Sequence, residues 1–146
     1  MKQVFAEYRF LPLIFAIASM ATPTDAQAPA GSAFDGTWSV YLICSATADG
    51  AFGYSYNFVA QVKNGLLHGE HGIKGQPDSL TIDGPIQPDG SALISASGLT
   101  GNPSSSVGRV PRQTPYSYHV KAHFDATVGT GTRLETRPCT MHFVKS

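Results

Sequence analysis

The segment His68-Gly-Glu70-His71 brings together side-chain types that can bind zinc. Imidazole nitrogens and carboxylate oxygens are both good ligands for this ion. The surrounding residues alternate as in a strand, so His68 and Glu70 share one face while His71 points to the other. The spacing also differs from the helical His-Glu-x-x-His of metalloproteases. We therefore predict no metal site here and interpret the segment as a solvated hairpin edge.

Signals of catalysis are also weak elsewhere in the chain. His119 and His123 share a strand face but lie about 13 Å apart, too far to bind one ion, so we interpret both as surface residues beside Lys121. The sequence contains no Gly-x-Ser-x-Gly elbow, Gly-x-Gly-x-x-Gly fingerprint or P-loop. Aspartates stand mainly at predicted strand ends and turns, where their side chains form local hydrogen bonds. We expect neither an enzyme nor a cofactor.

Aromatic residues form the clearest candidate binding surface. Strand parity places seven of them on one inward face: Trp38, Tyr54, Tyr56, Phe58, Tyr116, Tyr118 and Phe124. A buried tyrosine needs a partner for its hydroxyl, so four inward tyrosines favour a cavity with polar rims. The predicted ligand-binding residues are Trp38, Tyr54, Tyr56, Tyr116 and Tyr118. The alternative is a barrel that its own side chains fill completely.

The elements that must position these residues are short strands. Glycine and proline interrupt runs rich in Val, Ile, Tyr, Phe and Thr, and no segment sustains a helical apolar stripe. Asn64-Gly65 is typical of a type I′ hairpin turn, and Gly129-Thr-Gly131 is interpreted as another turn. Strands are expected over 37–44, 54–63, 66–71, 79–83, 91–99, 116–124, 132–137 and 139–143.

Seven or eight strands in one small domain favour an all-β fold, a small antiparallel up-and-down barrel, with a β-sandwich as the alternative. Cys44 and Cys139 lie on the apolar faces of the first and last strands, so their disulfide would close the barrel seam. The fifteen residues 101–115 lack a periodic pattern. We expect this loop, with Arg109 and Arg112, to be a lid or a partner-contact surface, the alternative being a mobile connection.

The N-terminus has the layout of a secretory signal peptide. Lys2 and Arg9 precede an apolar run at 10–21, followed by small and polar residues. This run rises only about 18 Å as a helix, against a bilayer core of about 30 Å, so we expect no transmembrane anchor after cleavage. The predicted division is a signal peptide at 1–26, a flexible arm at 27–33 and one domain at 34–146. The mature protein would then be periplasmic or extracellular, where a cysteine pair oxidises.

Charge excludes some partner classes. The 146 residues contain ten Lys and Arg against ten Asp and Glu, so the formal net charge is zero. A neutral chain has no broad basic field for phosphate backbones, and we expect no nucleic-acid partner.

The domain opens with Phe34-Asp35-Gly36-Thr37-Trp38. This segment resembles the Gly-x-Trp first strand of calycin-like proteins: lipocalins, fatty-acid-binding proteins and avidins. The resemblance implies a barrel whose base is closed by Trp38, with a late arginine, Arg133 or Arg137, packed over the indole. The chain also resembles small exported bacterial proteins of unassigned function.

Together these features predict an exported, non-catalytic binding or interaction module that holds a small apolar or aromatic ligand in its barrel. One alternative is a structural or envelope-associated protein that contacts a macromolecule, such as an envelope protein, with its outer face. The other is an unrecognised hydrolase.

Overall fold

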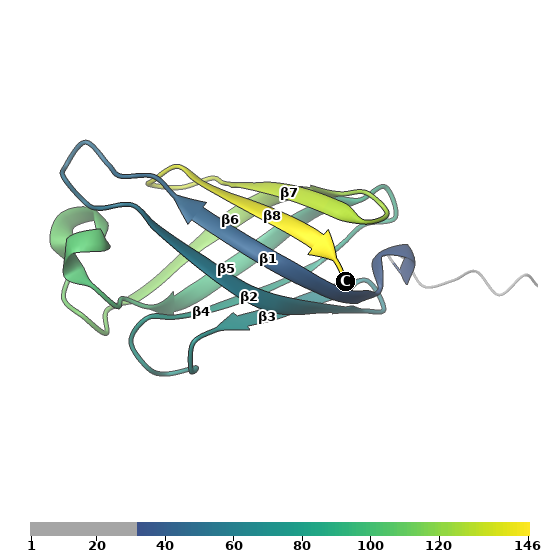
Figure 1. The fold of residues 1–146 in the computed structure, drawn as a ribbon, viewed down its shortest axis with the longest axis horizontal. Coiled ribbons are helices and arrows are strands. Elements are labelled where there is room, and N and C mark those ends of the chain that lie inside the picture. The colour runs from purple at the N-terminus through teal and green to yellow at the C-terminus, as the bar shows by residue number, and fades with distance from the viewer. Residues whose placement is uncertain (1–31) are drawn as a thin grey trace, which may run out of the picture.

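A computed structural model describes residues 32–146, which form a closed antiparallel barrel of eight strands joined in sequence order (Figure 1). The strands are β1 (Gly36–Cys44), β2 (Tyr54–Lys63), β3 (Leu66–His71), β4 (Ser79–Pro85), β5 (Ser91–Leu99), β6 (Pro115–Phe124), β7 (Val128–Arg133) and β8 (Cys139–Lys145). The predicted up-and-down barrel is confirmed, and the closed strand order excludes the sandwich. The predicted signal peptide at 1–26 and residues 27–31 of the arm lie outside the described residues.

Helical structure within the described residues is limited to three 3-10 turns: η1 (Ser32–Phe34), η2 (Pro103–Ser105) and η3 (Val107–Arg109). The first of these begins inside the segment predicted as a flexible arm, and its Phe34 is buried. None of the helices at 32–146 is long and apolar enough to cross a membrane.

The barrel closes between its first and last strands. β1 pairs with β2 on one side and with β8 on the other, and Cys44 is the partner of Cys139 in the register between β1 and β8. The two cysteines form a disulfide, with Cα atoms 4.1 Å apart and a sequence separation of 95. The predicted disulfide across the closure seam is therefore confirmed.

One end of the barrel is closed by short turns and a packed aromatic core. Trp38 is 0% exposed, and its indole N–H donates a hydrogen bond of 2.9 Å to the carbonyl oxygen of Phe34. Its ring meets the Phe124 ring edge to face, with centroids 5.3 Å apart. The cation over the indole is Lys145, whose Nζ lies 5.6 Å from the ring centroid. The expectation that Arg133 or Arg137 covers Trp38 is wrong, because both arginines line a pocket at the other end.

The Asn64-Gly65 turn at the closed end is confirmed. Asn64 has a φ of 51° and Gly65 a φ of 74°, the positive values that a type I′ turn requires at both positions. Asp35 stabilises the turn, because its carboxylate accepts hydrogen bonds from both backbone N–H groups, at 2.8 and 2.9 Å.

The predicted turn at 129–131 is wrong, and so are the bounds of the strand placed after it. Gly129 and Gly131 lie inside β7 and face the barrel interior. A Cβ atom at Gly129 would lie 2.7 Å from the Phe124 ring, and one at Gly131 would lie 2.6 Å from a Val120 methyl. These glycines therefore make room for β6 side chains, while the turn itself spans 125–127 and the chain leaves the sheet at 134.

Longer connections gather at the opposite end of the barrel (Figure 1). They are the β1–β2 loop (45–53), the β3–β4 loop (72–78), the β5–β6 connection (100–114) and the β7–β8 loop (134–138). The two 3-10 turns η2 and η3 belong to the β5–β6 connection. This loop end holds the candidate site.

Candidate functional site: a pocket lined by tyrosine and arginine

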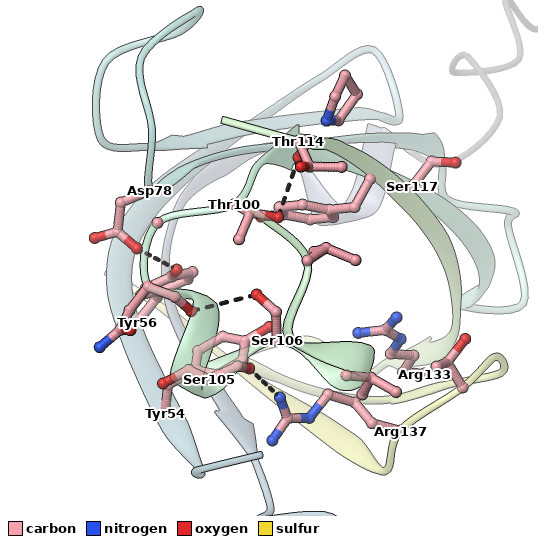
Figure 2. Close-up of a pocket in the computed structure, with 17 residues that line it drawn as sticks. Tyr54, Tyr56, Asp78, Thr100, Ser105, Ser106, Thr114, Ser117, Arg133 and Arg137 are labelled. Atoms are coloured by element: carbon pink, nitrogen blue, oxygen red, sulfur yellow. Dashed lines mark hydrogen bonds between the residues drawn. The ribbon is translucent and has the colours of Figure 1, made fainter. Parts of the chain in front are cut away.

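A pocket of about 490 Å³ opens at the loop end of the barrel (Figure 2). Its wall is built from the ends of β2, β6 and β7 and from the β3–β4, β5–β6 and β7–β8 connections. The volume falls within the range of about 300–1,000 Å³ that is usual for small-molecule sites.

Three tyrosines form the aromatic wall of the pocket. Tyr54 and Tyr56 come from β2, with ring centroids 5.0 Å apart, and Tyr116 comes from β6. The Tyr56 hydroxyl donates to an Asp78 carboxylate oxygen at 2.6 Å, and the Tyr116 hydroxyl donates to the carbonyl oxygen of Ser79 at 3.0 Å. These bonds hold the two hydroxyls against the start of β4, and both residues line the cavity.

Tyr118 is the next inward-facing residue of β6 after Tyr116, and it is 2% exposed. Its ring stacks on Tyr116 with centroids 6.1 Å apart, and the Arg133 guanidinium lies 3.9 Å above its centroid. The Tyr118 hydroxyl has no hydrogen-bond partner in the described part of the chain. Tyr118 therefore supports the pocket from below.

Burial raises the pKa of all four tyrosines above the usual value of about 10. For Tyr56 the bond to Asp78 adds to the effect, since a phenolate could not donate this hydrogen bond and would be repelled by the carboxylate. The pocket therefore presents neutral phenols at any physiological pH.

Alkaline titration should show this effect on the tyrosine pKa values. The folded chain retains four protons that the unfolded chain releases near pH 10, so the free energy of unfolding is unaffected below that pH and falls above it. We expect phenolate absorbance from these rings to appear together with the loss of the circular dichroism of the fold. Tyr41→Phe, which removes a tyrosine on the outer face, should leave this cooperative step in place. Ionisation of all four rings in an intact fold would contradict the prediction.

Arg137 ties two of the loops around the pocket together. It lies in the β7–β8 loop, is 3% exposed and donates to the carbonyl oxygens of Ser45, Phe52 and Ser105, the last at 2.6 Å. Its guanidinium lies 5.0 Å from the Tyr54 ring centroid. Arg137 thus holds the β1–β2 loop and the β5–β6 connection in one arrangement.

The β5–β6 connection forms one wall of the pocket through residues that include Val107 and Val110. Its η3 turn is bonded to the β1–β2 loop, because the Gly108 N–H donates to Asp49 at 2.9 Å. This bond, with a second from the Thr47 hydroxyl, lowers the pKa of Asp49 to about 2. Arg109 and Arg112, the predicted contact residues of this connection, are exposed and do not line the pocket.

Gly98 on β5 leaves the space that the Tyr116 hydroxyl needs. A Cβ atom there would lie 1.9 Å from the carbonyl oxygen of Ser79 and 2.6 Å from the Tyr116 hydroxyl, so it would break their hydrogen bond. We expect Gly98→Ala to lower the free energy of unfolding by about 1–3 kcal/mol and to shift the Tyr116 ring resonances. Urea unfolding and NMR measure the two effects, with Ser97→Ala on the outer face as control. Wild-type stability with unmoved Tyr116 resonances would contradict the prediction.

The predicted ligand-binding residues fall into three places. Tyr54, Tyr56 and Tyr116 line the pocket, Tyr118 lies beneath it, and Trp38 belongs to the core of the closed end. The sequence interpretation missed Arg133 and Arg137 as pocket residues. Gly129, Gly131 and Arg133 occupy alternate positions on the inward face of β7, so the alternation of this strand could have predicted Arg133 as an inward residue. The turn that was predicted at 129–131 prevented this interpretation.

Histidines lie largely on the outer surface. His68 contacts Asp83 at 2.6 Å and His119 contacts Glu135 at 2.7 Å, both as exposed pairs. His71 faces the other way and stacks on the Tyr56 ring at 3.8 Å. Over residues 32–146, no group of three or more His, Cys, Asp and Glu side chains is placed to hold a metal ion.

Comparisons with protein-family models, curated proteins and solved structures found no match for this chain.

Proposed function

We propose that the protein is a non-catalytic binding module that holds a small organic molecule in the pocket at the loop end of the barrel. The observation that carries this proposal is the contrast between the two ends. The closed end is filled by Trp38, Phe124 and their neighbours, whereas the loop end keeps a cavity of about 490 Å³.

The chemistry of the walls supports a ligand with a flat or apolar body. The hydroxyls of Tyr56 and Tyr116 are bonded to the protein, and the rings of both residues add aromatic surface to the lining. Val107, Val110 and Pro115 add apolar surface. The lining also contains polar side chains, among them Ser106, Arg133 and Asp78, and polar groups at fixed positions beside apolar surface are the usual basis for orienting a small ligand.

The disulfide supports a site of action outside the reducing cytosol. Disulfides persist in secreted and periplasmic proteins, and this one joins the first and last strands of the barrel. We therefore place the binding function in the periplasm or the extracellular space, after removal of the predicted signal peptide at 1–26.

The binding function is tested by titrating small-molecule probes into the wild-type protein and into a variant whose pocket is filled by a large side chain. The oxidised protein is titrated with three naphthalene probes that differ in head group: 2-naphthoate, neutral 2-naphthamide and cationic 2-naphthylmethylammonium. We expect at least one probe to shift the NMR signals of Tyr54, Tyr56 and Tyr116. Ser106 lies on the pocket side of the β5–β6 connection (Figure 2), so Ser106→Trp should abolish these shifts.

Ser95→Trp provides the matched control, because Ser95 is exposed on the outer face of β5 and does not line the pocket. It should leave probe binding unchanged. If no probe shifts the pocket signals, or if Ser106→Trp binds as the wild type does, the proposed function is wrong.

A second candidate is contact with a macromolecule through the outer face. The observation in its favour is a group of exposed apolar side chains on β1, β2 and β8: Tyr41, Ile43, Val59 and Val144. The register places Val59 and Val144 on either side of Ser39. If the outer face is the contact surface, the double variant Tyr41→Ser with Ile43→Ser would abolish cross-linking to an envelope protein. The pocket variant Ser106→Trp would not.

A further inference from the structure

We infer that the ligand of the pocket is a singly charged organic anion whose carboxylate is bound by Arg133. This inference rests on the proposed function and names the chemical class of ligand for the same site. It follows from the charges that line the pocket, the contacts of the two arginines and the position of the only carboxylate among the described lining residues.

The pocket contains more positive than negative charge. Two guanidinium groups, from Arg133 and Arg137, line it together with one carboxylate, from Asp78. In Figure 2 Asp78 lies beside Tyr56 on one side of the pocket, and the two arginines lie on the other. Over residues 32–146, every ion pair within 4.0 Å involves a histidine, so neither arginine has a carboxylate within that distance. The lining therefore carries a net charge of about one positive unit.

Among residues 32–146, the charge of Arg137 is removed from water without a counter-ion. Arg137 is 3% exposed, its bonds go to neutral carbonyl groups, and its Nε has no hydrogen-bond partner in this part of the chain. Burying a cation without an opposite charge is costly, and carbonyl dipoles offset only part of that cost. An anion in the adjacent pocket would offset more of it, because electrostatic attraction to a guanidinium that is itself shielded from water is stronger than to an exposed one.

Arg133 has the free donors to bind that anion. Its Nε donates to the carbonyl oxygen of Glu135 at 2.7 Å, and its Nη1 makes a weak contact of 3.9 Å with the Cys139 sulfur. Its guanidinium plane is supported by the Tyr118 ring. Nη2 has no hydrogen-bond partner within residues 32–146, and the only contact of Nη1 there is the weak one with the sulfur. These two groups form one edge of the guanidinium, which can bind both oxygens of a carboxylate.

Asp78 favours a single negative charge on the ligand. The carboxylate of Asp78 faces the same cavity from the tyrosine side and would repel a second acidic group there. A monoanion balances the lining, whereas a dianion would leave an excess negative charge. The aromatic wall between Asp78 and the arginines would then contact the uncharged body of the ligand.

Matched probes test the charge preference directly. 2-Naphthoate and 2-naphthamide have the same ring system and nearly the same shape, and they differ in charge. We expect isothermal titration of the wild-type protein to give at least about tenfold tighter binding of the naphthoate, because a hydrogen-bonded charge pair contributes more than a neutral contact. Arg133→Gln should reduce naphthoate affinity by about tenfold or more and abolish the preference.

Arg112→Gln is the control, since it removes the same charge from an exposed residue outside the pocket and should retain the preference. Arg133→Lys keeps the charge but loses the two-donor edge, so it should show an intermediate preference. Equal binding of naphthoate and naphthamide to the wild-type pocket would overturn the anion inference and leave the proposed function intact. An unchanged preference in a folded Arg133→Gln variant would overturn the role of Arg133. Absence of pocket binding by every probe would overturn both proposals.

Discussion

Trp38→Ala is expected to lower the free energy of unfolding by about 3–5 kcal/mol, the usual cost of truncating a large buried aromatic residue. The indole is 0% exposed and packs edge to face on Phe124. Alanine would leave a cavity at the closed end of the barrel and remove the hydrogen bond to the carbonyl oxygen of Phe34. Since small domains are stable by only about 5–15 kcal/mol, this is a large share of the total.

Urea unfolding followed by circular dichroism is the suitable measurement, because Trp38 is the only tryptophan and its removal eliminates the fluorescence signal. Tyr41→Ala is the matched control, on the same strand but 43% exposed on the outer face, and it should cost less than about 1 kcal/mol. Trp38→Phe should fall between the two, since it keeps an aromatic ring and loses the N–H donor. A loss below about 1 kcal/mol for Trp38→Ala would contradict the placement of the indole in the core.

Loss of the disulfide should cost about 4–5 kcal/mol in the free energy of unfolding. The bond joins cysteines 95 positions apart, and a cross-link that closes so long a loop removes much conformational entropy from the unfolded chain. Its ends lie in the paired strands β1 and β8, so the same bond also holds the seam of the barrel.

The double variant Cys44→Ala with Cys139→Ala measures this contribution in urea unfolding, with dithiothreitol treatment of the wild type as a second route. Dithiothreitol should have no effect on the double variant. The naphthoate preference should survive in the folded double variant, because Arg133 makes only a weak contact with the Cys139 sulfur. If the double variant unfolds at the same urea concentration as the wild type, the disulfide does not stabilise this fold as argued.

Local residue patterns were sufficient to predict most of the barrel. Alternation in residues such as Tyr54 to Val62 depends only on side chains pointing to opposite faces of a strand, and a sheet with one buried face must show it. Asn64-Gly65 predicted its hairpin because few residues tolerate two consecutive positive φ angles. The positions of Cys44 and Cys139 on the apolar faces of the first and last strands predicted closure at that seam. Each of these signals is local or follows from strand order.

The same local rules misplaced β7. The conformational preferences of glycine favour turns, so Gly129 and Gly131 were interpreted as a turn. The sequence does not show which side chains pack against them. In the fold, the Phe124 ring and the Val120 side chain occupy the space where their side chains would lie. Packing across the barrel therefore decided between turn and strand at these positions.

The sequence by itself determined seven of the eight strands, the inward tyrosines and the disulfide, because these depend on alternation and on chain order. The tertiary structure alone decided that Trp38 belongs to a filled end while Tyr54, Tyr56 and Tyr116 surround a cavity. It also brought Arg133 and Arg137 beside those tyrosines and placed Asp78 across from them. The physical reason is that a pocket is the space left between side chains from distant segments, and this space depends on how every loop at one end packs against the others.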